Sequence, residues 1–112
     1  MNASVEQVRA ILAELVKAAL VSDDGRSLAY REAARDLLKD LAAAPPDPAS
    51  VRMDGAWTLA VADAETPARQ PEQGRVNLTL PRQAPFTLAD LLAPDFDVDR
   101  AVDDIGKAAS TG

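Results

Sequence analysis

Apolar residues in the first 44 positions recur with the period of an α-helix. The first apolar stripe comprises Val5, Val8, Ile11, Leu12, Leu15, Val16, Ala19 and Leu20. After a short polar break, a second stripe comprises Tyr30, Ala33, Ala34, Leu37, Leu38 and Leu41. Ser27 is placed to cap the second helix, and Pro45 and Pro46 end it. Two amphipathic helices joined by a short turn predict an antiparallel helical hairpin over residues 1–44.

After the prolines the apolar period changes from 3.6 to 2. Larger apolar residues alternate with smaller or polar ones in two runs, which contain Trp57, Leu59 and Val61, and Val76, Leu78 and Leu80. This alternation predicts two strands, and Val51–Met53 would add a short third strand. The intervening residues 63–74 are polar, contain two prolines and predict either a mobile loop or a segment that becomes ordered on binding. We therefore expect a small antiparallel sheet of two or three strands within residues 51–81.

Residues 83–112 contain the signals of two short helices. Thr87 and Asp90 have the spacing of a capping box, and Phe86 and Leu91 have the spacing of a hydrophobic staple. Asp97 can cap a final helix, whose apolar side comprises Val98, Ala101, Val102 and Ile105. The whole sequence thus predicts a single small α+β domain over residues 1–112, in which the helical hairpin packs on the sheet and two short C-terminal helices follow.

Composition limits the core that this domain can build. Apolar residues make up 47% of the 112 positions, but 23 of them are alanine. A leucine-sized side chain contributes about 1.5–3 kcal/mol when it is buried, and alanine contributes far less. The core is therefore thin, and we expect stability to depend on a homodimer or an obligate complex.

The net charge of −6 is concentrated near the C-terminus, because residues 83–112 contain six aspartates and only two basic residues. Basic residues form no cluster, which disfavours direct binding to nucleic acid or to an anionic membrane. We expect neither a signal peptide nor a transmembrane span, because charged residues interrupt each apolar stretch near the N-terminus, and the sequence has no cysteine. We expect a cytoplasmic protein without disulfides.

The chain has no histidine and no cysteine, so it lacks the residues of the commonest acid–base, nucleophilic and soft-metal sites. Its five glycines are isolated and form no phosphate-binding loop. Residues 95–99 place carboxylates like the start of an EF-hand loop, but Arg100 replaces its glycine and Gly106 its closing glutamate. We expect no metal, no cofactor and no enzyme; an enzyme using carboxylates and a lysine is the remaining alternative.

The acidic C-terminal segment is then the expected working surface, and its expected partner is another protein with a basic surface. Trp57, the only tryptophan, is either a core anchor or an interface hot spot. The candidate partner-binding residues are Trp57, Phe86, Leu88, Leu91, Leu92, Phe96, Asp95, Asp97 and Asp99. The predicted function is that of a non-enzymatic adaptor or accessory subunit.

One resemblance offers an alternative function. Gly74-Arg-Val-Asn-Leu-Thr-Leu-Pro81, followed by Phe86-Thr-Leu-Ala-Asp-Leu-Leu-Ala93 and an acidic tail, is similar to the end of AbrB-like antitoxins. In that family an acidic C-terminal segment wraps a basic toxin. The similarity covers about the last third of the chain, and the first half does not match the family's swapped-hairpin DNA-binding core. The resemblance implies an antitoxin-like inhibitor that binds its toxin through Phe86, Leu88, Leu91, Leu92 and Phe96.

Overall fold

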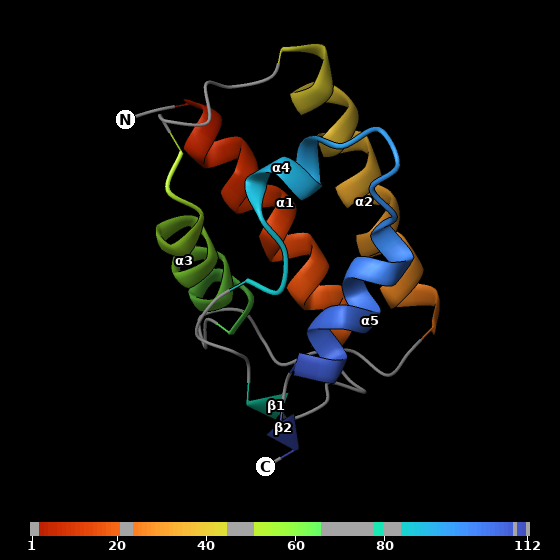
Figure 1. Cartoon of the computed structure of the whole chain (residues 1–112). Coiled ribbons are helices and arrows are strands. Elements are labelled where there is room, and N and C mark those ends of the chain that lie inside the picture. Colours follow the sequence, from red (N-terminus) through yellow and green to blue (C-terminus); the bar gives the residue numbers. More distant parts are fainter. Residues whose placement is uncertain are drawn as a thin grey trace.

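The computed structural model describes residues 3–20, 24–44, 51–65, 78–79, 84–108 and 110–111. This part of the chain contains the helices α1 (Ala3–Leu20), α2 (Asp24–Ala43), α3 (Met53–Glu65), α4 (Leu88–Leu92) and α5 (Val98–Ala108), and the two-residue strands β1 (Leu78–Thr79) and β2 (Ser110–Thr111). Figure 1 shows α1 in the middle of the molecule, with α3 on one side and α2 and α5 on the other.

Helix α1 is central because its apolar residues cover most of its circumference. Its buried residues are Val8, Ile11, Leu12, Ala13, Leu15, Val16, Ala18 and Leu20. This surface is wider than one helical stripe, so α2, α3 and α5 can all pack against α1. Helix α2 runs antiparallel to α1 (Figure 1), and the two form the expected helical hairpin.

Ser27 has a different role from the predicted helix cap. Helix α2 already begins at Asp24, and Ser27 is buried inside it. Its hydroxyl donates to the carbonyl oxygen of Ala18 at 3.0 Å and accepts a hydrogen bond from Arg31 Nε at 3.1 Å. Carbonyls in the last turn of a helix lack a partner within the helix, so Ser27 satisfies one of them and ties α2 to the end of α1.

The prediction of an α+β fold is wrong, because residues 53–65 form α3 and not a strand. Ala56, Trp57 and Ala60 are buried, which is the spacing of one helical face. A strand would place Ala56 and Ala60 on its outer face. In α3 they are instead the small residues of the buried side, which packs against α1. Alanine also has the highest helix propensity of all residues. Leu59, predicted to share a face with Trp57, is 42% exposed.

The rest of the predicted sheet is also wrong within the described residues. Leu78–Thr79 pairs antiparallel with Ser110–Thr111, and not with residues 57–61. Val51 and Arg52 precede α3 and Met53 begins it, so they form no third strand. Of the predicted loop 63–74, residues 63–65 end α3 and the others lie outside the described residues. The described fold is helical, with one pair of two-residue strands.

The two C-terminal helices confirm their predicted caps. Thr87 Oγ1 accepts the backbone N–H of Asp90 at 3.2 Å, and Asp90 Oδ2 accepts that of Thr87 at 2.8 Å. Asp97 Oδ1 accepts the N–H groups of Asp99 and Arg100 at 2.9 and 3.3 Å. The buried residues of α5 are the predicted Val98, Ala101, Val102 and Ile105. Both helices therefore belong to the core that α1 organises.

An ion pair joins α1 to α3. Arg9 on α1 forms a two-pronged ion pair with Asp63 on α3, with Nε–Oδ2 and Nη2–Oδ1 distances of 2.6 and 2.7 Å. This two-bond geometry is the specific form of an arginine–carboxylate pair, and it joins α1 to α3 beside their apolar contact. Within the described ranges, no helix has the length and apolarity needed to cross a membrane.

Candidate functional site

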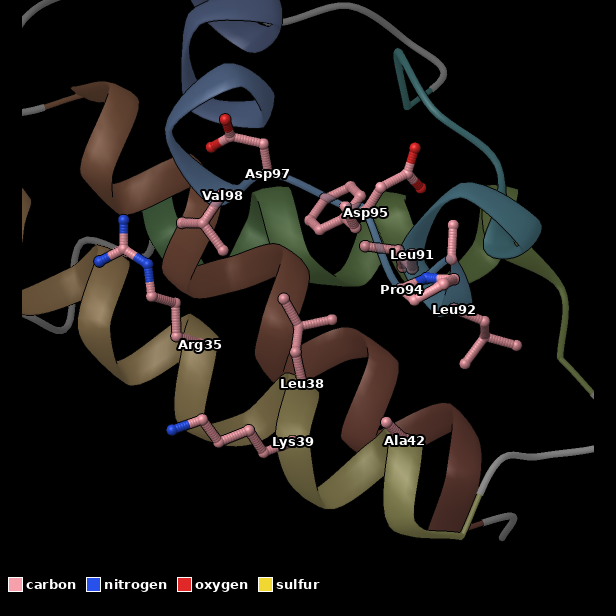
Figure 2. Close-up of a pocket in the computed structure, with 12 residues that line it drawn as sticks. Arg35, Leu38, Lys39, Ala42, Leu91, Leu92, Pro94, Asp95, Asp97 and Val98 are labelled. Carbon is pink, nitrogen blue, oxygen red and sulfur yellow. The ribbon is translucent and has the colours of Figure 1, made fainter.

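An open groove of about 650 Å³ lies between the second half of α2 and residues 91–98. We call this cavity the groove. Helix α2 lines it with Arg35, Leu38, Lys39 and Ala42, and every residue from 91 to 98 lines the opposite wall. Figure 2 shows Leu38 pointing from α2 toward that wall, whereas Lys39 extends along the outside of α2.

The sequence of α2 explains why it can line the core and the groove together. Ala34 and Leu41, seven residues apart, are fully buried in the core. Residues 35, 38, 39 and 42 lie on a neighbouring face of the same helix, because positions three and four apart are adjacent. The opposite wall exists because Pro94 cannot extend α4, and the chain crosses from Ala93 to Asp97 before α5 begins.

A second hollow of about 380 Å³, which we call the acidic hollow, shares part of its lining with the groove. It is lined by Pro85, Phe86, Asp90, Ala93, Asp95, Phe96, Asp97, Arg100, Ala101 and Asp104. Asp95, Phe96 and Asp97 line both cavities. Residues 93–97 therefore form a ridge between a largely apolar groove and a hollow that contains four carboxylates and one guanidinium.

A row of aromatic rings supports the ridge from inside. Trp57 and Phe86 meet edge to face with centroids 6.4 Å apart, and Phe86 and Phe96 do the same at 5.8 Å. Trp57 is only 1% exposed and Phe86 9%, whereas Phe96 is partly exposed. Edge-to-face pairs are favourable beyond their buried area, so Phe96 is held in place on the ridge by contacts that continue to α3.

Asp99, in the first turn of α5, attaches this helix to α2. Its carboxylate accepts hydrogen bonds from Arg31 Nη1 at 2.9 Å and from Arg35 Nη2 at 3.0 Å. The hydrogen bond from Arg31, together with the charges of both arginines, lowers the pKa of Asp99. Two arginines therefore neutralise this aspartate, and it is not a free acidic group of the surface.

We predict that the stabilisation contributed by Asp99 is lost in acid. Because the pKa of Asp99 is lower in the folded chain than in the unfolded chain, the unfolded chain binds the proton more tightly, and stability rises with pH. This contribution is complete above the unfolded pKa of about 4 and is lost as the pH falls through the folded pKa. Urea unfolding of the wild type and Asp99→Asn at pH 7 and pH 3 should give a stability difference that is smaller at pH 3. An equal difference at the two pH values would contradict the assignment, and Arg31→Gln with Arg35→Gln should remove the same pH dependence.

The structure divides the nine predicted partner-binding residues into two groups. Trp57, Phe86, Leu88 and Leu91 are buried in the chain's own core. Leu92 and Phe96 are partly exposed, Asp95 is exposed, Asp97 caps α5, and Asp99 pairs with arginines. Five of the nine line the groove, namely Leu91, Leu92, Asp95, Phe96 and Asp97. A toxin bound in the manner of the AbrB-like class would meet mainly Leu92 and Phe96 in this conformation.

The α2 wall of the groove has no counterpart among the sequence predictions. Leu38 belongs to the stripe predicted for the helical hairpin, and Arg35, Lys39 and Ala42 belong to no predicted site. One signal was present, because Leu37 and Leu38 are adjacent and make the stripe wider than a single helix contact needs.

No group of three or more acidic residues is arranged to hold a metal ion in the part of the chain that the structure describes. Comparisons of the chain with protein-family models, curated proteins and solved structures give no match. The similarity of residues 74–93 to AbrB-like antitoxins is thus not accompanied by a family match. A function for the groove has to be argued from its own residues.

Proposed function

We propose that this protein is a non-enzymatic binding module, an adaptor or accessory subunit, that holds a segment of another protein in the groove. One observation carries the proposal: five of the nine residues that the sequence selects for partner binding line this one cavity. They come together with an α2 wall that lies at least 49 residues away in sequence, the separation of Ala42 from Leu91. The acidic segment acts through this cavity in the folded chain.

The chemistry of the groove is that of a protein interface. Leu38, Leu92 and Phe96 present partly exposed apolar surface, and charged side chains surround them. Interfaces commonly have an apolar centre with a polar rim. Phe96 is already fixed by Phe86, so its ordering costs little when a partner binds. A fixed aromatic residue beside a hollow is a common energetic centre of binding.

The charged groups of the groove support binding more than acid–base catalysis. Arg35 is hydrogen-bonded to Asp99, and Asp97 is bonded to the backbone at the start of α5. Both groups are thus committed to holding α5 in place. Lys39 and Asp95 stand on opposite walls of the groove, where they can pair with charges of a bound chain.

Affinity purification of the tagged full chain from its native host tests the proposal when a matched pair of variants is included. Ala42→Tyr fills the groove from an exposed position of α2, and Ala29→Tyr makes the same change at an exposed position outside it. We expect proteins that co-purify with the wild type and Ala29→Tyr to be reduced at least about tenfold with Ala42→Tyr, a loss of roughly 1.4 kcal/mol of binding free energy. Equal recovery with both folded variants would refute binding through the groove.

A further inference from the structure

We propose that the occupant of the groove is an amphipathic α-helix of another protein, with an arginine or lysine beside its apolar stripe that reaches over the ridge into the acidic hollow. This inference rests on the proposed function and adds the chemistry of the partner. It follows from the length of the groove and from the charges on its two sides.

The α2 wall has the length of a short helical contact. It extends from Arg35 to Ala42, which is two helical turns or about 10 Å at 1.5 Å per residue. A helix with apolar residues at positions i, i+3 or i+4, and i+7 presents a stripe of the same length. Leu38 on one wall and Leu92 and Phe96 on the other supply the apolar surface that such a stripe would cover.

The charges on the two sides of the groove differ in sign. Asp95 and Asp97 on the ridge, together with Asp90 and Asp104 beyond it, line the acidic hollow with a single basic residue, Arg100. The hollow therefore has a formal charge of −3 (four negative groups less one positive). Lys39 stands on the opposite side, on α2. A bound helix would therefore be favoured when it carries a basic residue on the side of the ridge, and it can carry an acidic residue near Lys39.

The acidity of this hollow is not neutralised within the described part of the chain. Asp90 and Asp97 bond only to backbone N–H groups there, and the carboxylates of Asp95 and Asp104 form no ion pair or hydrogen bond with described residues. Asp99 differs, since Arg31 and Arg35 neutralise it. A basic side chain in the hollow would also lie beside the ring of Phe96, where a cation–π contact adds to the attraction.

Synthetic helical peptides can test this charge preference. Three 14-residue probes share leucines at i, i+3, i+4 and i+7 and carry arginine, glutamine or glutamate at one flanking position. Each is titrated into the isotope-labelled full chain at about 0.15 M salt and followed by amide NMR, a salt level that screens distant charges. We expect the arginine probe to shift the amides of Leu38, Leu92 and Phe96 and to bind more tightly than the glutamate probe.

Two single-charge variants separate a local contact from general acidity. Asp95→Asn removes a carboxylate of the ridge, and Asp103→Asn removes one from an exposed position of α5 that lines neither cavity. Asp95→Asn should weaken the arginine probe about threefold to fivefold, the upper part of the range for an exposed ion pair, and should leave the glutamine probe unchanged. Asp103→Asn should change the affinity for the arginine probe less than about twofold, because Asp103 is exposed to solvent and lines neither cavity.

Three results would overturn the inference: equal weakening by Asp95→Asn and Asp103→Asn, equal affinity for the arginine and glutamate probes, or no shift at the groove with any probe. The co-purification experiment keeps the proposed function separate. If Ala42→Tyr abolishes capture of another protein whose bound segment has no basic helix, the proposed function stands and this inference fails. If the captured chain is a second copy of this protein, both fail.

Discussion

Replacing Trp57 with alanine is expected to lower the free energy of unfolding by about 3–5 kcal/mol, the cost of removing a large aromatic side chain from a core. Trp57 is 1% exposed on the buried face of α3 and meets Phe86 edge to face. Because domains of this size are stable by only about 5–15 kcal/mol, the loss is a large part of the total. Urea unfolding followed by circular dichroism measures it without relying on tryptophan fluorescence.

Leu59→Ala is the control for this experiment, and it also tests the fold. A strand over residues 57–61 would place Trp57 and Leu59 on one face, and truncating either would then be costly. In α3, Leu59 is 42% exposed, so its truncation should change stability by no more than about 0.5 kcal/mol. A loss of several kcal/mol on Leu59→Ala would contradict the helical assignment of residues 53–65.

The elements that the sequence predicted correctly are those in which periodicity and capping agree. In α1, each apolar residue has its neighbour in the stripe three or four positions away. The capping box joins Thr87 to Asp90, and Asp97 caps the backbone within the next three residues. Local hydrogen bonds and local burial decide such features, so they can be read without knowing the rest of the fold.

Helix α3 could not be predicted in this way, because alanine fits either side of an amphipathic element. Between Ala56 and Val61 an alternating pattern and a helical pattern use the same residues, and only the neighbour decides between them. The neighbour is α1, whose broad apolar surface accepts the face formed by Ala56, Trp57 and Ala60. Tertiary contact thus overrode the local pattern.

Only one wall of the groove could be predicted from the sequence, for a similar reason. Residues 91–98 carry visible signals, namely aromatic and acidic residues next to a proline, and five of these eight residues are among the predicted partner-binding residues. The other wall depends on how α4 and α5 pack across α2, which brings Leu38 opposite Leu92. The same packing buries Phe86, Leu88 and Leu91 in the core, whereas the sequence predicts them at the surface that binds a partner.

Replacing Ile105 with alanine is expected to lower the free energy of unfolding by about 2–5 kcal/mol, although only seven residues follow it in the sequence. Ile105 is fully buried, together with Val102 and Ala101, on the side of α5 that packs on α1. Urea unfolding should show one transition at the same midpoint by Trp57 fluorescence and by circular dichroism, because α5 and the aromatic row share one core.

Lys107→Ala, at an exposed position of the same helix, is the control and should alter stability by no more than about 0.5 kcal/mol. If Ile105→Ala left the Trp57 transition unchanged while helical signal was lost earlier, α5 would be a separable tail.

The expected single transition has a direct consequence for binding studies. Deleting residues 83–112 would remove Phe86, Leu91 and Ile105 from the core, so it would abolish binding by unfolding the chain. Single substitutions at exposed groove positions such as Ala42 and Asp95 are therefore the changes that report on the acidic segment as a binding surface.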